Sequence, residues 1–236
     1  MDHHLDFLEK VEHKTVLRGE GGRKFNIVVS TASYSVRTMF EETNMKTVSA
    51  EMLGTFFLVF FGFTAFASSD DAFAGALTFG LTLMVLMHVF GPISGCHLNP
   101  AVTIGNMMSK KTSQDDAICY MAAQVVGATL GFVLFKFLNP GTDDSMFADD
   151  IGILVAAAVG TMFFVMTLLS TQDPFAVGAA LFVVSSAAFA DVNAGVDIGS
   201  MLANAIDGNA DWAFFGVIGS VVGAFAGWAV KDNFLD

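Results

Sequence analysis

GPISGCHLNPAVTIGN, at residues 91–106, interrupts a long apolar part of the chain with glycine and proline. A break at membrane depth exposes backbone amide and carbonyl groups, which are costly in lipid unless protein or water covers them. We therefore expect a re-entrant loop, in which the chain enters the membrane, turns, and begins a short helix at the midplane. Asn99 suits the N-cap of that helix and Pro100 its first residue, because proline lacks the amide that would stay unpaired. Such a half-helix points the positive end of its dipole into the membrane centre, which is typical of a pore.

The composition is that of a membrane protein. Of the 236 residues, 54% are apolar and only 14% are charged, which is too few charges to cover a soluble surface. A helix needs about 20 residues to span the hydrocarbon, and six apolar stretches reach that length, the fifth only just: 47–69, 72–92, 115–138, 149–171, 174–190 and 211–231. Two shorter apolar pieces, 99–108 and 197–206, are expected to be half-helices. The predicted fold is an all-α membrane protein with six transmembrane helices and two re-entrant half-helices.

The basic residues predict the orientation in the membrane. Seven of the eleven lysines and arginines lie in residues 1–46. Six crossings would put Lys110, Lys111 and Lys231 on the same side as that segment, and only Lys136 on the other. The positive-inside rule then predicts that both termini are cytoplasmic, with the plasma membrane as the default location. The net charge of -12 arises from acidic loops on the other side, and nothing indicates binding to nucleic acid.

The chain is expected to consist of an N-terminal extension, a channel domain and a short tail. The channel domain contains an internal repeat, because GTMFF at 160–164 echoes GTFF at 54–57. An odd number of crossings in each copy inverts the second copy relative to the first. The expected boundaries are 1–46 for the extension, 47–231 for the channel domain (repeat one 47–138, repeat two 149–231) and 232–236 for the tail.

SGCHLNPAVTIG resembles the first Asn-Pro-Ala loop of the aquaporin and aquaglyceroporin (major intrinsic protein) family. AEMLGTFFLVFFG at 50–62, ALTFGLTLMVLMHVFGPISG at 76–95 and AAQVVGA at 122–128 resemble that family's first three helices. The resemblance implies a channel that assembles as a homotetramer. It also implies that Glu51 accepts hydrogen bonds from backbone amides of the loop, and we interpret His97 as a second residue that orders the loop rather than as a metal ligand.

The second loop departs from the family pattern, and two registers compete for its motif. The register at Asn193 keeps the asparagine, whereas the register at Asp197 replaces every motif residue. The spacing of 19 residues between Gly80 and Asn99 (99 − 80) recurs between Gly178 and Asp197 (197 − 178). This spacing favours Asp197, which is also a good N-cap. The expected pore-motif residues are then Asn99, Pro100, Ala101, Asp197, Ile198 and Gly199.

The resemblance also locates the narrowest constriction of the channel. Water-selective members have Phe, His and Arg there, whereas this chain keeps only the Phe. Serine is smaller than histidine or arginine and is neutral, so a wider and less positive opening is expected. Ala157 stands where repeat one has Glu51, so the second loop is expected to lack a carboxylate support. The expected constriction residues are Phe79, Ser185, Ala194 and Ser200.

The leading functional interpretation is a passive channel for water and small neutral solutes of glycerol or urea size. No metal site, cofactor motif or arrangement of nucleophile and base is evident, so an enzyme is not expected. The expected partners are the permeating solutes, the lipid bilayer and further copies of the chain. The alternative is a non-conducting or cation-leaky membrane protein with a structural or assembly role, because the second motif is degenerate.

Overall fold

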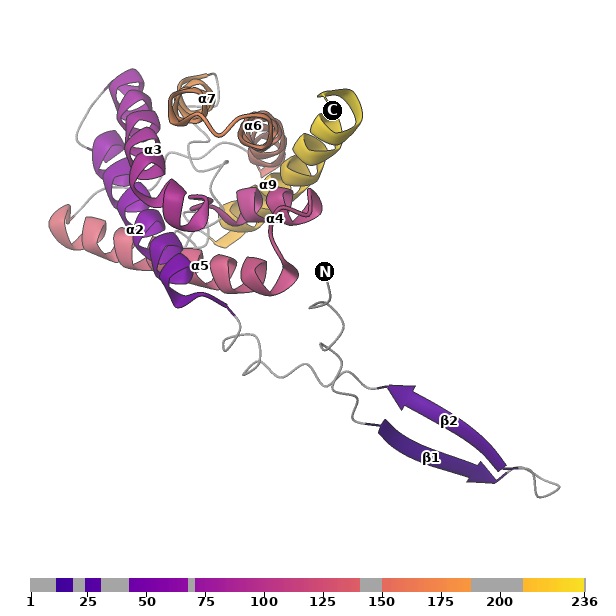
Figure 1. Ribbon diagram of the computed structural model, residues 1–236. Helices are drawn as coiled ribbons and strands as arrows, with labels where there is room; N and C mark the ends of the chain where they lie inside the picture. The colour runs from indigo at the N-terminus through magenta and orange to yellow at the C-terminus, as the bar shows by residue number, and fades with distance from the viewer. Residues whose placement is uncertain are drawn as a thin grey trace. The chain divides into compact units, whose positions relative to one another are not determined.

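The computed structural model describes residues 12–18, 24–30, 43–67, 71–140, 150–187 and 210–235. The chain divides into two units, Met1–Glu42 and Thr43–Asp236. The first unit contains an antiparallel hairpin of β1 (Glu12–Arg18) and β2 (Lys24–Ser30), coloured indigo in Figure 1. The sequence analysis predicted only an extension in this part of the chain.

The second unit is helical, as predicted. Five of its described helices are long and apolar enough to cross a membrane: Met45–Ala67, Ala72–Ser94, Gln114–Leu138, Gly152–Ser170 and Phe214–Leu235. The described elements are α2 (Met45–Ala67), α3 (Ala72–Ser94), α4 (Pro100–Met108), α5 (Gln114–Leu138), α6 (Asp150–Ser170), α7 (Pro174–Ser186), α9 (Ala210–Val230) and the π-helical turn η2 (Lys231–Leu235). The short helix α7 begins at the predicted residue, and the predicted end of that segment lies outside the described residues.

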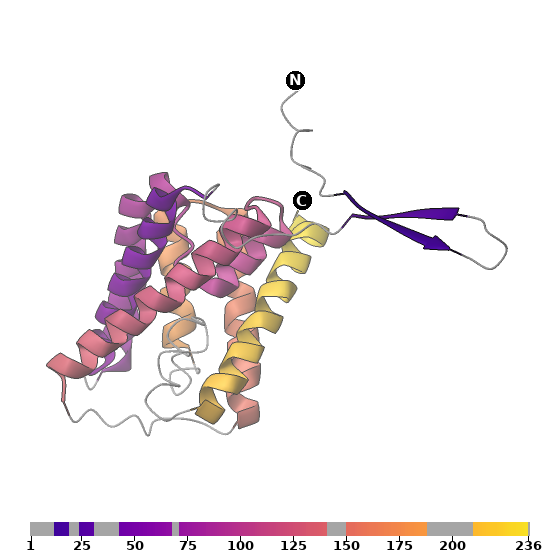
Figure 2. The ribbon, with the colours of Figure 1, turned by 90° about the horizontal axis from the view of Figure 1, so that it is seen from below.

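The helices pack as two similar halves. In the first half, α2 packs against α3 and α5; in the second half, α6 packs against α7 and α9. The halves meet where α3 packs against α7, and α4 contacts α5, α6 and α9 (Figure 2). This pairing matches the predicted repeat, since α2 packs against α3 and α5 as α6 packs against α7 and α9.

Glycines at equivalent positions let the helix backbones touch. A Cβ on Gly127 of α5 would overlap the carbonyl oxygen of Met52 in α2, and a Cβ on Gly223 of α9 would overlap that of Ala158 in α6. Within a membrane, such small residues permit the close packing that holds helices together. The equivalence of Gly127 and Gly223 therefore sets the alignment of the two halves.

The contact between α3 and α7 relates the halves to each other. A Cβ on Gly80 would lie 2.5 Å from the carbonyl oxygen of Gly178, and a Cβ on Gly178 would lie 2.7 Å from that of Gly80. A reciprocal contact of this kind is the mark of a twofold relation, in which each residue meets its own counterpart. Gly80 and Gly178 are thus equivalent positions of the two halves.

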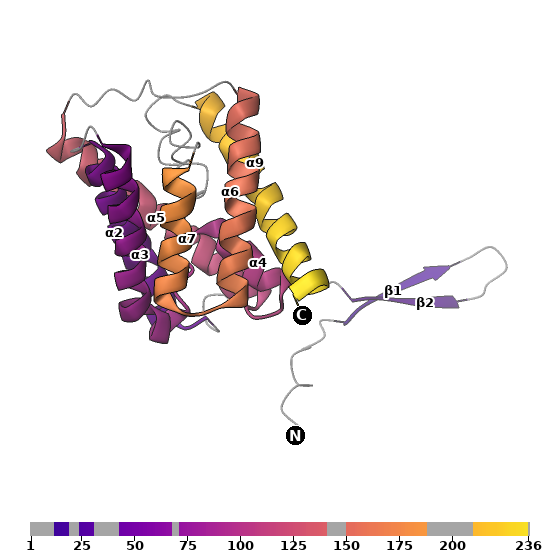
Figure 3. The ribbon, with the colours of Figure 1, turned by 90° about the horizontal axis from the view of Figure 1, so that it is seen from above.

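The bundle has two ends, which we name by the residue at which α2 begins. At the Met45 face, α2, α5 and α7 begin and α3, α6 and α9 end; Figure 3 shows the α6–α7 connection and the end of α9 at that face. The other end is the opposite face. Lysines 46, 110, 111 and 231 belong to the Met45 face, and Lys136, in the last turn of α5, to the opposite face.

The helix that leads into the loop runs farther than predicted. The sequence analysis ended it at residue 92, but α3 continues through Gly91 and Pro92 to Ser94. Pro92 removes only the one amide that would bond to the carbonyl of His88, and this loss is tolerated so close to a helix end. Gly95, with φ of 86°, ends the helix in the left-handed conformation.

Candidate functional site

The loop between α3 and α4 has an unusual backbone. Gly95, Cys96 and Leu98 have φ of 86°, 54° and 49°. Residues other than glycine pay of order 1–3 kcal/mol for such a conformation and keep it only when their surroundings fix it. The loop therefore needs support from outside itself.

Glu51, on α2, supplies that support through both carboxylate oxygens. Its Oε1 accepts hydrogen bonds from the Ser94 hydroxyl at 2.5 Å and the His97 amide at 3.0 Å, and its Oε2 accepts one from the Leu98 amide at 2.7 Å. The side chain is 0% exposed. A buried carboxylate needs such donors to be tolerated, and the loop amides need an acceptor, so each group satisfies the other.

Gln124, on α5, completes a buried polar network that the sequence analysis missed. Its Nε2 donates to Glu51 Oε2 at 2.8 Å and to the Thr103 hydroxyl at 2.9 Å, and Thr103 Oγ1 lies 3.1 Å from His97 Nδ1. The network ties α2, the loop, α4 and α5 together. The one signal in the sequence was an amide side chain inside an otherwise apolar span.

The half-helix α4 begins at the predicted residues. Asn99 has an extended backbone, with φ of -152° and ψ of 126°, and its Oδ1 accepts from the Ala101 amide at 2.8 Å. Pro100 is the first helical residue. Asn99 is 3% and Ala101 0% exposed, so the start of α4 lies inside the bundle, where the positive end of its dipole favours an electron-rich group.

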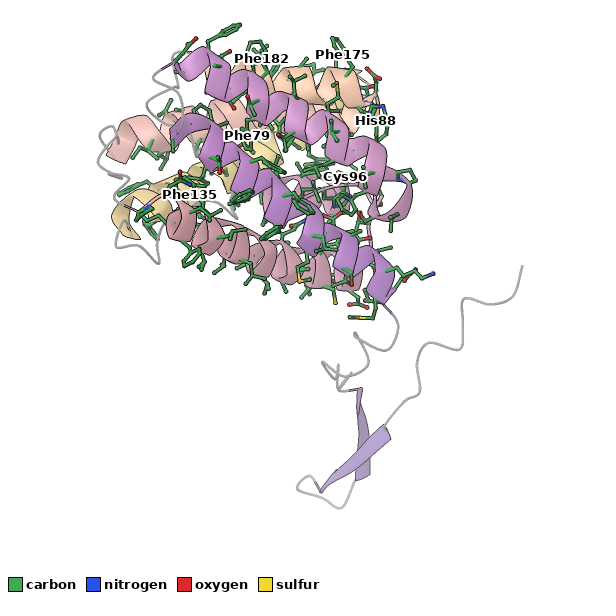
Figure 4. All side chains as sticks on the ribbon, turned by 90° about the vertical axis from the view of Figure 1, so that its left-hand side faces the viewer. Phe79, His88, Cys96, Phe135, Phe175 and Phe182 are labelled. Atoms are coloured by element: carbon green, nitrogen blue, oxygen red, sulfur yellow. The ribbon has the colours of Figure 1, made fainter. Side chains whose placement is uncertain are left out.

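Two of the expected constriction residues are described. Phe79 lies near the start of α3 and Ser185 near the end of α7, so both belong to the half of the bundle toward the opposite face. Both are buried, and the Phe79 ring packs over Gly62 and 6.4 Å, between centroids, from that of Phe66. Figure 4 shows Phe79 between α2 and α3 and Cys96 inside the bundle. The expected residues Ala194, Asp197, Ile198, Gly199 and Ser200 lie outside the described residues.

The second half has different side chains where the first half has the polar network. Ala157 occupies the position of Glu51 and Ser220 that of Gln124, as the shared glycines of the two halves align them. Both residues are 0% exposed. The Thr161 hydroxyl donates to Ser220 Oγ at 3.2 Å, so α6 and α9 bond directly to each other.

A cavity of about 410 Å³ opens at the Met45 face, beside the loop and α4. Its lining includes His97 of the loop, Asn106 of α4, Tyr120 of α5, Lys111 and Gln172. The Lys111 ammonium donates to the Leu169 carbonyl at 2.9 Å, and so satisfies a free carbonyl at the end of α6. Within the part of the chain that the structure describes, no three His, Cys, Asp or Glu side chains gather as metal ligands do.

Comparison with known proteins extends the resemblance to most of the chain. The family model for the major intrinsic proteins matches residues 38–231. Aquaporin Z of Photorhabdus laumondii is 30% identical over 219 residues, which cover 76% of this chain and 94% of that protein. The glycerol uptake facilitator-like protein 6 of Lactiplantibacillus plantarum is 42% identical over 93 residues.

Some of these matches span only part of each protein. The similarity to the Lactiplantibacillus protein covers 39% of this chain and 43% of that protein, and the similarity to the dog lens fiber major intrinsic protein covers 54% and 53%. The crystal structure of the Plasmodium falciparum aquaglyceroporin shares the fold, with a TM-score of 0.73 and 18% identity over 81% of this chain and 96% of that chain.

Proposed function

Because the chain belongs to the major intrinsic protein family, we propose that it forms a passive transmembrane channel for water and small neutral solutes of glycerol or urea size. Members of that family are channels rather than enzymes. The observation that carries the proposal is the supported loop, in which Glu51 and Gln124 hold a strained backbone at the start of a buried half-helix. Such irregular backbone is tolerated at membrane depth only where it is buried in protein or lines a water-filled cavity.

The pore walls can provide what passive conduction needs. A solute that leaves bulk water must find donors and acceptors along the path, while ions face a barrier from dehydration and from fixed dipoles. At the start of α4 the positive end of the helix dipole favours a solute oxygen and disfavours a cation. We assign Asn99, Pro100 and Ala101 to the pore motif, and Glu51 and His97 to its support.

The second motif is assigned to Asp197, Ile198 and Gly199. The reciprocal contact of Gly80 with Gly178 supports this register, because Asn99 and Asp197 follow these two equivalent glycines by the same 19 residues. With this register the constriction is formed by Phe79, Ser185, Ala194 and Ser200. An opening with two serines and no arginine is wider and less positive, so it admits solutes larger than water.

The family and the charges support an orientation and an assembly. The lysines of the Met45 face support a cytoplasmic location of that face and of both termini by the positive-inside rule. The plasma membrane is the proposed location, and a homotetramer the proposed assembly, by resemblance to the family.

Flux through the purified protein in vesicles tests the proposal. Stopped-flow light scattering should show water and glycerol permeability well above that of empty vesicles, and voltage should drive no current above background. If vesicles that contain the protein are no more permeable to water and glycerol than empty vesicles, the channel is contradicted and a structural role is favoured. A cation current in the same vesicles would favour the leaky alternative.

A further inference from the structure

Asn106 is a buried polar side chain that the supported loop does not use. It lies about two helical turns after Asn99 on α4, is 4% exposed, and faces the cavity at the Met45 face. Its Nδ2 donates to the Val102 carbonyl oxygen at 3.0 Å. This bond fixes the orientation of the amide, because the flipped amide would bring two oxygens together.

The amide oxygen of Asn106 is left to face the cavity. No described residue bonds to its Oδ1, which has two lone pairs. The enclosed side-chain atoms without a partner in the described residues are Thr43 Oγ1 and Trp228 Nε1. Asn106 Oδ1 also has no partner in that part of the chain but is not one of these enclosed atoms, so it is accessible. Because Asn106 lines the cavity, a molecule in the cavity can donate a hydrogen bond to Oδ1.

His97 offers a second hydrogen-bonding group to the same cavity. Thr103 Oγ1 donates to the Asn99 carbonyl at 3.2 Å and lies 3.1 Å from His97 Nδ1. Which of Nδ1 and Oγ1 donates depends on the imidazole tautomer, so Nε2, which has no partner among the described residues, can either accept from a molecule in the cavity or donate to it. His97 is 7% exposed and lines the cavity with Asn106.

Donors are present as well as acceptors. The Lys111 ammonium uses one of its three protons on the Leu169 carbonyl, and Lys111 lines the cavity. Figure 3 shows α4, which carries Asn106, beside α6, which carries Leu169. The cavity of about 410 Å³ has room for about a dozen waters at roughly 30 Å³ each, so a three-carbon solute fits.

We propose that this cavity is a binding subsite for small neutral solutes with neighbouring hydroxyl groups, and that Asn106 determines the preference for them. A hydroxyl group both donates and accepts, so one hydroxyl can donate to Asn106 Oδ1 while its neighbour accepts from Lys111. The solute thereby replaces the water that it loses on entering the narrow path. The inference rests on the proposed channel function.

The test compares glycerol and water permeability in vesicles for the wild-type protein and three variants. Asn106→Leu keeps the size of the side chain but removes the amide, and we expect the glycerol-to-water ratio to fall about two- to tenfold, as for the loss of one neutral hydrogen bond. The glycerol concentration that half-saturates the flux should rise. Asn106→Ser, which retains a hydroxyl, should recover part of the ratio. Met107→Leu, on the same helix and outside the cavity lining, should match the wild type.

The outcomes separate this inference from the proposed function. If the wild type conducts and Asn106→Leu leaves the ratio and the half-saturating concentration unchanged, the subsite is wrong while the channel stands. An equal fall in water and glycerol flux would also overturn the subsite, because the variant would then have lost conduction in general and not the preference for glycerol. If Asn106→Leu does not fold, Lys111→Met provides the comparison: it keeps the stem, removes the donors, and should lower the ratio. An unchanged ratio in Lys111→Met would then overturn the subsite.

Discussion

The two halves of the bundle cross in the same way but satisfy their buried polar groups differently. Gly127 and Gly223 bring α5 onto α2 and α9 onto α6 at equivalent points. Three residues before these glycines, the first half has Gln124 bonded to Glu51, whereas the second half has Ser220 bonded to Thr161. The helix crossing is thus preserved although the polar side chains beside it are replaced.

The replacement changes what each helix pair can hold. Glu51 has two oxygens that each accept more than one hydrogen bond, so it can bond to α5 and to the loop together. Ala157, at the matching position, can accept none through its side chain. A hydroxyl pair such as Thr161 and Ser220 links two helices but has fewer groups to offer a third segment. The first half therefore adds a long-range polar network to its close packing, whereas α6 and α9 combine close packing with one hydroxyl pair.

The largest effect is expected from Glu51→Leu, which removes the network from the first half. The His97 and Leu98 amides would lose their acceptor, at about 1–3 kcal/mol for each buried amide, and native proteins have only about 5–15 kcal/mol of stability. We expect loss of flux and a large fall in the thermal midpoint in detergent. Glu51→Gln, whose amide accepts fewer hydrogen bonds than a carboxylate, should have a thermal midpoint and a flux between those of the wild type and Glu51→Leu. Wild-type stability and flux in Glu51→Leu would show that the carboxylate does not support the loop.

The next largest effect is expected at the crossings, where the two halves should respond alike. Gly127→Ala and Gly223→Ala each place a methyl group against a backbone carbonyl, and overpacking of this kind costs about 1–3 kcal/mol. Thermal unfolding in detergent should show similar falls for both variants. A fall in only one of them would contradict the equivalence of the two crossings.

A selective change is expected from Ser200→Arg, which would bring the second half closer to the water-selective pattern. The arginine should narrow the proposed constriction and add a barrier to cations, so glycerol flux should fall several-fold more than water flux. Paired stopped-flow measurements on one vesicle preparation give the ratio directly. A folded variant with an unchanged ratio would remove Ser200 from the constriction.

The smallest effect is expected from Ser220→Ala, which removes the hydroxyl pair of the second half. Hydrogen bonds between membrane helices contribute about 0.6 kcal/mol on average, so the thermal midpoint should fall only slightly and flux should persist. Gln124→Leu, at the matching position of the first half, should cost more because two partners lose a donor. Equal effects of the two variants would contradict the contrast between the halves.

Local chemistry made several elements predictable from the sequence. The start of α4 follows from an asparagine N-cap and a proline at the first position, both of which act within a few residues. The repeat was predicted from a short echo and was found in the pairing of the helices. The end of α3 was misplaced because Pro92 was taken as a break, although the helix tolerates it and ends at Gly95.

Long-range relations were not predictable in the same way. Gln124 lies 73 residues from the Glu51 carboxylate to which it donates, and nothing in its neighbourhood indicates that partner. The proposed role of Asn106 could not be predicted from the sequence, because it depends on a cavity formed by five separate segments. The second motif also tested the limits of spacing, because its register was chosen by comparing two intervals rather than from its own residues.

The reciprocal contact of Gly80 and Gly178 constrains how such a chain can evolve. Elsewhere the two halves can accumulate different substitutions, as Glu51 and Ala157 have done, because each position has its own surroundings. Where α3 meets α7, however, Gly80 and Gly178 pack against each other. A larger residue at either position must therefore be accommodated by both halves. Divergence between the two halves is therefore coupled where α3 meets α7.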